Sequence, residues 1–199
     1  MSDAPVSRPE SSIESHAVSR RAQVARAALA IVAGAALMTL AAKVQIPFWP
    51  VPMTLHTMAV MAFAVAFGPR RAMAIFLAYL AAGAAGLPVF SGSPERGLGL
   101  AYMAGPTGGY LLGYLIASGL VGALAAGRGP MGRLFSMLAG LAPIYGFGLV
   151  WLAAYVPAER LIALGLAPFL PGDLIKIALV ATASALVPGL IARFRGIGQ

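Results

Sequence analysis

The sequence predicts an all-α integral membrane protein with six transmembrane helices and both termini in the cytoplasm. Of its 199 residues, 60% are hydrophobic and only 10% are charged, whereas a soluble domain carries roughly 25% charged residues. Six stretches approach the about 20 mostly apolar residues that a membrane-spanning helix needs; they are 22–42, 53–68, 71–87, 106–126, 134–156 and 172–192. These spans leave only short loops and a tail, which excludes a soluble globular enzyme.

Residues 1–21 precede the first span and are predicted to form a disordered cytoplasmic tail, because they are polar and include two prolines and several serines. Arg20 and Arg21 stand directly before an apolar run, as basic residues do in a secretory signal. The run is long, however, and five further spans follow it, so we interpret it as the first membrane span. Residues 22–199 are therefore predicted to form one six-helix membrane domain.

A proline-rich segment, residues 46–56, joins the first two spans. Its prolines predict that the chain enters the membrane there as irregular backbone, which is tolerated only where protein buries it or where it lines a cavity. Phe48 and Trp49 fit two interpretations, an interfacial aromatic belt or the apolar wall or lid of a pocket that faces outward. His56 has no acidic or histidine partner at ligand spacing, so a buried hydrogen-bonding role is favoured over a metal site.

Small residues recur at every fourth position in several spans. Gly109, Gly113 and Ala117 form such a ridge in the fourth span, and Ala30 and Gly34 form a shorter one in the first. This spacing places the residues on one face, where two helix backbones can approach closely. Internal helix packing and contact with a partner protein both remain open for these ridges.

The sequence Gly-Pro-Thr-Gly-Gly-Tyr at 105–110 opens the fourth span. Glycines allow a ligand to approach the backbone, the start of a helix presents free N–H groups, and Thr107 and Tyr110 add hydroxyls. A ligand-binding turn and an ordinary loop-to-helix turn with close packing fit this pattern equally well. The preceding turn at 86–92, which contains Phe90, has the composition of a flexible turn.

Asp173 and Lys176 form the one pair of ionisable residues expected at membrane depth, at the start of the sixth span. Residues three apart share a helix face, so the two side chains can converge. Charges inside the bilayer are costly and usually mark a substrate path. The alternative is that Asp173 caps the helix and pairs locally with Lys176. A lysine in the first turn opposes the helix dipole, which favours an anion supplied from elsewhere, such as a ligand carboxylate.

The basic residues favour one orientation of the six spans. With both termini on one side, that side holds Arg8, Arg20, Arg21, Arg26, Arg70, Arg71, Arg128, Arg133, Arg193 and Arg195, and the other side holds Lys43, Arg96 and Arg160. Cytoplasmic segments are enriched in Lys and Arg, which predicts cytoplasmic termini. The net charge of +8 then reflects topology and contact with membrane lipid. The charges are scattered, so they do not form the basic groove of a nucleic-acid-binding protein.

Residue sets for catalysis are missing from the sequence. There are no cysteines, no second acidic residue at membrane depth to pair with Asp173, and no phosphate-binding GxxxxGK[ST] loop. We therefore expect no catalytic residues, no metal and no cofactor, and we exclude ATP hydrolysis by this chain itself.

Taken together, the motifs resemble the BioY family, the biotin-specific substrate-binding (S) components of energy-coupling factor (ECF) transporters. The resemblance extends from about residue 37 to 180. It rests on Pro-Val-Pro-x-Thr-Leu, Gly-Pro-Arg-Arg, Gly-Leu-Pro-Val-Phe, Gly-Pro-Thr-Gly-Gly-Tyr-Leu and Pro-Phe-Leu-Pro-Gly-Asp-Leu-Ile-Lys, in this order. It implies a multi-pass protein of the bacterial cell membrane that captures biotin from outside, under a lid formed by the loop between spans 1 and 2.

The resemblance also implies partners and site residues. The partners are an ECF coupling protein, which Ala30 and Gly34 would contact, and a pair of ATPase subunits. Asp173 would accept hydrogen bonds from the ureido N–H groups of biotin, and Lys176 would neutralise its carboxylate. The remaining substrate-binding candidates are Tyr110, Thr107, Gly108, Gly109, Thr54, His56, Trp49 and Phe90.

Two departures from the family pattern stand out. His56 occupies a position where the family usually has glutamine, and residues 91–97 replace its usual glycine-rich run. The alternatives are a self-sufficient biotin carrier that needs no ATPase and an S component for a different vitamin.

Overall fold

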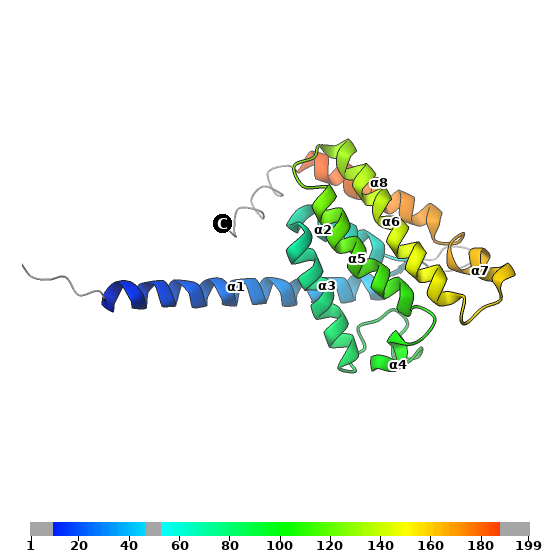
Figure 1. Cartoon of the computed structure of the whole chain (residues 1–199), viewed down its shortest axis with the longest axis horizontal. Helices are drawn as coiled ribbons and strands as arrows, with labels where there is room; N and C mark the ends of the chain where they lie inside the picture. The colour runs from blue at the N-terminus through cyan, green and yellow to red at the C-terminus, as the bar shows by residue number, and fades with distance from the viewer. Residues whose placement is uncertain (1–9, 47–52, 188–199) are drawn as a thin grey trace, which may run out of the picture.

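The computed structural model describes residues 10–46 and 53–187, and within them eight helices and one two-stranded sheet (Figure 1). The elements are α1 (Glu10–Lys43), β1 (Gln45–Ile46), β2 (Met53–Thr54), α2 (His56–Phe67), α3 (Pro69–Ala84), α4 (Gly99–Met103), α5 (Gly108–Leu124), α6 (Pro130–Leu152), α7 (Ala158–Gly165) and α8 (Leu170–Leu186). Six of these helices follow the six predicted spans in order. The short helices α4 and α7 were not predicted.

The first helix is longer than the span that the sequence predicts. It begins at Glu10, so it includes part of the segment predicted to be disordered, while residues 1–9 lie outside the described part. Figure 1 shows the N-terminal portion of α1 projecting well beyond the other helices. Its C-terminal portion packs on α3, because a Cβ atom added to Gly34 would lie 2.7 Å from Cδ1 of Ile75.

The predicted second span is helical over only part of its length. Met53 and Thr54 are extended and pair antiparallel with β1, with Thr54 opposite Gln45. The 12 residues of α2 rise about 18 Å, which is less than the ~30 Å thickness of the hydrocarbon core. Within the described residues, three helical stretches are long and apolar enough to cross a membrane, Arg20–Lys43, Pro130–Leu152 and Ala158–Leu186, and α2 and α5 are shorter apolar helices. That the chain crosses the membrane six times stays a prediction.

Helix α2 is the centre of the bundle. It is apolar around its whole circumference, which is typical of a fully buried helix, and Val60, Met61 and Ala64 are completely buried. One face joins a core that includes residues of α5, α6 and α8. The other joins a second core that includes residues of α1 and α3. The two cores meet around α2, so the helix that carries His56 is packed on two faces.

Helices α5 and α6 pack at backbone distance along the predicted ridge of small residues. A Cβ atom on Gly113 would lie 2.6 Å from both Ile144 Cα and the Pro143 carbonyl oxygen. A Cβ atom on Gly109 would lie 2.3 Å from the Phe147 carbonyl oxygen. The internal-packing interpretation of this ridge is therefore confirmed.

We expect Gly113→Ala to destabilise the folded protein. Alanine gains about 0.5–1 kcal/mol over glycine in a helix, but its methyl group would meet backbone atoms that cannot move without separating α5 from α6. Such overpacking costs about 1–3 kcal/mol, so the net effect is a lower melting temperature in detergent. The matched control is Gly146→Ala on α6, because a Cβ atom there meets nothing within 4 Å. Equal melting temperatures for the two variants would contradict the expectation.

Candidate ligand-binding site

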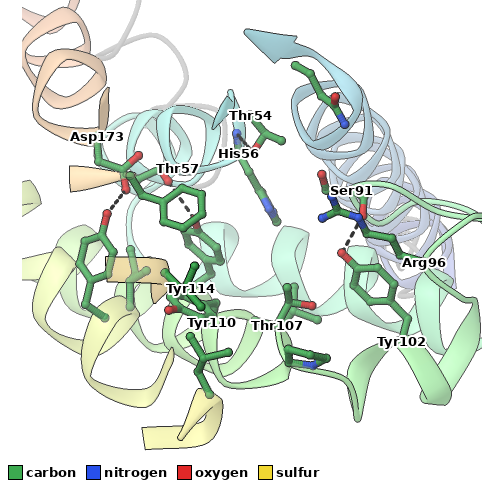
Figure 2. Close-up of a pocket in the computed structure, with 18 of the residues that line it drawn as sticks. Thr54, His56, Thr57, Ser91, Arg96, Tyr102, Thr107, Tyr110, Tyr114 and Asp173 are labelled. Carbon is green, nitrogen blue, oxygen red and sulfur yellow. Dashed lines mark hydrogen bonds between the residues drawn. The ribbon is translucent and has the colours of Figure 1, made fainter. Parts of the chain in front are cut away.

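A cavity of about 240 Å³ opens among the helices. Side chains from every described element except α1 line it, together with residues from the loops before α4 and α5. Ligand sites for drug-sized molecules typically measure about 300–1,000 Å³, so this cavity suits a small ligand. Figure 2 shows Asp173 on one side of it, Ser91, Arg96 and Tyr102 on the opposite side, and His56 between them.

The first side of the cavity is a buried ion pair. Asp173 and Lys176 are only 3% and 6% exposed. The Lys176 ammonium donates to Oδ1 of Asp173 at 3.0 Å, and the Tyr145 hydroxyl donates to Oδ2 at 2.8 Å. An ionised carboxylate has about four acceptor positions, so Asp173 retains acceptor capacity. A buried pair of this kind is weak evidence for stability, because desolvation offsets much of the attraction.

Local packing fixes where this ion pair lies. Met53 packs directly on the start of α8, because a Cβ atom on Gly172 would lie 1.9 Å from Met53 Sδ. The absence of a side chain at Gly172 therefore lets β2 approach α8. This contact brings Thr54 and Asp173, which both line the cavity, to neighbouring parts of its wall.

The middle of the cavity is aromatic. Five of the six tyrosines of the chain line it, namely Tyr79, Tyr102, Tyr110, Tyr114 and Tyr145. The Tyr114 hydroxyl shares a hydrogen bond of 2.8 Å with Thr57 Oγ1, and its ring lies 4.7 Å from the imidazole of His56. Such a wall suits a flat, mostly apolar ring system that carries a few polar groups.

His56 contributes an unsatisfied polar atom to this wall. Its side chain is buried, and Nε2 has no hydrogen-bond partner among the described residues. A buried polar atom without a partner costs about 1–3 kcal/mol. His56 lines the cavity as a residue, while Nε2 itself is almost completely covered.

The opposite side of the cavity carries a cation. Arg96 lines the cavity, lies in the exposed loop before α4, and forms no ion pair within the described part of the chain. The loop is compact here, since the Arg96 N–H donates to the Gly92 carbonyl at 2.8 Å. Tyr102 stabilises the loop, because its hydroxyl donates a hydrogen bond to the Ser91 carbonyl at 2.7 Å. Burial raises the pKa of Tyr102, which keeps this donor protonated at neutral pH.

The structure brings together six of the predicted substrate-binding residues, which line the cavity: Thr54, His56, Thr107, Tyr110, Asp173 and Lys176. Gly108, Gly109 and Phe90 do not line it. A Cβ atom on Gly108 would lie 2.0 Å from the Met103 carbonyl oxygen, so both glycines serve close packing. Phe90 is fully buried and stacks on Tyr102 with ring centroids 4.6 Å apart. Phe48 and Trp49 lie outside the described residues.

Several cavity residues escaped the sequence reasoning. They include Gln45, Thr57, Tyr79, Ser91, Tyr102, Tyr114 and Tyr145, and Arg96 was noted only as a loop charge. Tyrosines in the middle of apolar spans were an available signal, since each hydroxyl needs a partner at membrane depth. Arg96 and Ser91 carried no such signal, because the turn that places them depends on contacts distant in sequence.

The two residues predicted to contact a partner protein differ in their surroundings. Ala30 is exposed, whereas Gly34 is buried against Ile75 of α3. In this conformation only Ala30 is open to another protein, and its contact with a partner stays a prediction.

Comparisons with known proteins show which proteins this chain resembles. A sequence model of the BioY family matches residues 12–193. The chain is 36% identical over 148 residues to the biotin transporter BioY of Thermotoga maritima, which covers 73% of this chain and 86% of that protein. It is 38% identical over 160 residues to the biotin transporter BioY of Rhodobacter capsulatus, with coverage of 72% and 77%. A crystal structure of the S-component for biotin from an ECF-type ABC transporter shares the fold, with a TM-score of 0.68, 23% identity, and coverage of 92% of this chain and 95% of that one.

Proposed function

The chain belongs to the BioY family, and on this basis we propose that it is the biotin-binding membrane subunit of a biotin uptake system. The observation that carries the proposal is the division of the cavity into a buried carboxylate on one side, an aromatic middle and a cation on the other side. This order of chemical groups complements biotin along its length. The role is binding and transport of biotin, not catalysis.

The ureido ring of biotin has two N–H donors and one carbonyl acceptor, and we place it at Asp173. Tyr145 and Lys176 already donate to both carboxylate oxygens, which fixes the direction in which the carboxylate points. It can then accept from ureido N–H groups in charge-assisted hydrogen bonds. The sulfur-containing ring would lie against Tyr114 and the neighbouring aromatic side chains.

We assign the biotin carboxylate to Arg96. The sequence suggested Lys176 for this role, but its ammonium is engaged by Asp173 at 3.0 Å. A second carboxylate placed there would lie close to the first one. Arg96 has no acidic partner among the described residues, and guanidinium groups bind carboxylates through two parallel hydrogen bonds.

Six spans with cytoplasmic termini and an outward cavity remain part of the proposal. Two contacts support it. Lys43 and Arg96, both predicted to be on the outer side, belong to segments that touch, because Lys43 hydrogen-bonds to Ser93. Arg133, predicted to be on the cytoplasmic side, donates to the Ser184 carbonyl near the end of α8 at 2.8 Å. The proposed partners are the membrane lipid, an ECF coupling protein that binds the exposed part of α1 around Ala30, and ATPase subunits.

Equilibrium binding of radiolabelled biotin to the detergent-purified chain tests the function. We expect saturable binding without any partner, competition by desthiobiotin, which retains the ureido ring and the carboxylate, and no competition by riboflavin or thiamine. Competition by riboflavin or thiamine instead would identify an S component for another vitamin. No binding by a preparation that melts cooperatively would overturn the proposal.

Uptake in cells distinguishes a coupled subunit from a self-sufficient carrier. We expect cells that produce this chain together with an ECF module to accumulate labelled biotin, and cells that lack every ECF gene to bind it without accumulation. Accumulation against a gradient in the second strain would favour the self-sufficient carrier.

A further inference from the structure

The loop that carries Arg96 is fastened to the end of α1 by one lysine. The Lys43 ammonium donates to the Ser93 carbonyl oxygen and, at 3.0 Å, to Ser93 Oγ. Ser93 Oγ in turn donates to the Phe90 carbonyl at 2.7 Å. Ser93 is buried, with 4% of its surface exposed. A single cation from a distant helix therefore satisfies two acceptors of one buried residue in this loop.

Ser93 is close enough to Arg96 to determine where its backbone lies. Arg96 is three residues further along the chain, and its N–H donates to the carbonyl of Gly92, the residue that precedes Ser93. A shift of Ser93 thus moves the turn from which the guanidinium extends. The Tyr102 contact with Ser91 holds only the other end of this turn.

Lys43 also stands where three parts of the site meet. It is the last residue of α1, and Gln45 of β1, two residues later, lines the cavity. Strand β1 pairs with β2, whose Thr54 lines the cavity as well. Lys43 forms no ion pair among the described residues, so its charge is directed at Ser93.

We propose that Lys43 is a positioning residue for ligand affinity: it holds the loop that places Arg96 over the cavity and ties that loop to the end of α1. Helix α1 contributes no side chain to the cavity wall. Through Lys43 it nevertheless affects the end of the cavity where Arg96 would bind the ligand carboxylate. The proposal rests on the proposed function, since it needs biotin or a close analogue as the ligand.

The test compares two ligands on one variant, Lys43→Met, which keeps an unbranched side chain one heavy atom shorter and removes its charge. We expect the Kd for biotin to rise at least fivefold and the Kd for biotin methyl ester, which has no negative charge, to change less than twofold. Lys43→Arg, which retains a cationic donor, should restore the Kd for biotin to within twofold of the original. Equal weakening for both ligands, or none for either, would overturn the proposal.

Two further variants separate positioning from a direct effect of the Lys43 charge. If Lys43 acts through Arg96, adding Lys43→Met to Arg96→Gln should weaken biotin binding by less than twofold more, because coupled changes are not additive. A further fivefold loss in this double variant would mean that Lys43 attracts the ligand by itself and would overturn the positioning role. Arg160→Gln, which removes an exposed cation away from the cavity, should leave both Kd values unchanged.

Absence of biotin binding by the unmodified chain would overturn the proposed function and this inference with it. Normal binding by the unmodified chain, together with an unchanged Kd for biotin in Lys43→Met, would overturn this inference alone.

Discussion

Asp173→Asn is expected to weaken biotin binding at least tenfold, a free-energy loss of about 1.4 kcal/mol. The carboxylate of Asp173 offers only acceptors to the cavity, and donors from Lys176 and Tyr145 hold it in place. An asparagine would turn one oxygen into an N–H₂ group, which would face either one of these donors or the ureido N–H groups of the ligand. Titration of the purified variant with radiolabelled biotin measures the loss.

The same substitution leaves the Lys176 ammonium buried without its counter-charge, which costs about 3–5 kcal/mol of stability. Binding and stability therefore have to be separated. The variant that combines Asp173→Asn with Lys176→Met removes both charges, and we expect it to melt at a higher temperature than Asp173→Asn alone while still failing to bind biotin tightly. Recovery of biotin affinity together with stability would show that the pair serves the fold and not the ligand.

The ion pair itself could be anticipated, because residues 173 and 176 share a helix face by spacing alone and stand in an otherwise apolar span. Tyr145, which completes the site, lies 28 residues away in sequence on α6, and no local pattern joins it to α8. The order of the helices followed from hydropathy in the same local way. The prolines before Met53–Thr54 indicated that the second span starts with extended backbone. Nothing in the sequence indicated that Met53 packs on Gly172 of α8.

The glycines at 105–110 illustrate a limit of a different kind. Their sequence fits both a ligand-binding turn and a close helix contact, since both need a backbone free of side chains. The distances from the added Cβ atoms, 2.0 Å at Gly108 and 2.3 Å at Gly109, support packing against neighbouring backbone. The hydroxyl residues on either side, Thr107 and Tyr110, are the ones that reach the cavity. Composition could not separate these roles, because both occur within four consecutive residues, 107–110.

The cation at position 96 was the least predictable member of the site. An arginine in an exposed loop is normally a solvated surface charge, and nothing in residues 91–97 encodes the contact with Lys43, which is 50 residues away from Ser93. The fold alone turns this loop toward the cavity. A cation that the sequence marks only as an indicator of topology thereby lines the cavity, where we propose that it binds the ligand carboxylate.

Arg96→Gln should accordingly weaken biotin binding at least tenfold and leave the binding of biotin methyl ester within threefold. Hydrogen bonds to charged groups contribute about 1.5–3 kcal/mol, and the ester cannot form the ion pair. Arg96 is exposed to solvent, so salt should screen its contact with the carboxylate. Raising the salt concentration from about 0.05 M to about 0.5 M shortens the Debye length roughly threefold. Over this range we expect the affinity of the unmodified chain for biotin to fall and that of the variant to stay nearly constant.

Arg160→Gln is the matched control for this variant, because it removes the same charge from an exposed residue that does not line the cavity. If the effect of Arg96→Gln came from the net charge of the outer surface, both variants would weaken biotin binding and both would lose part of its salt dependence. If Arg96 instead contacts the carboxylate, only Arg96→Gln weakens biotin binding and reduces its salt dependence, whereas the binding of biotin methyl ester stays nearly unchanged in that variant. Equal losses for biotin and its ester in Arg96→Gln would place the ligand carboxylate elsewhere, and Lys176 would then be the remaining cation that lines the cavity among the described residues.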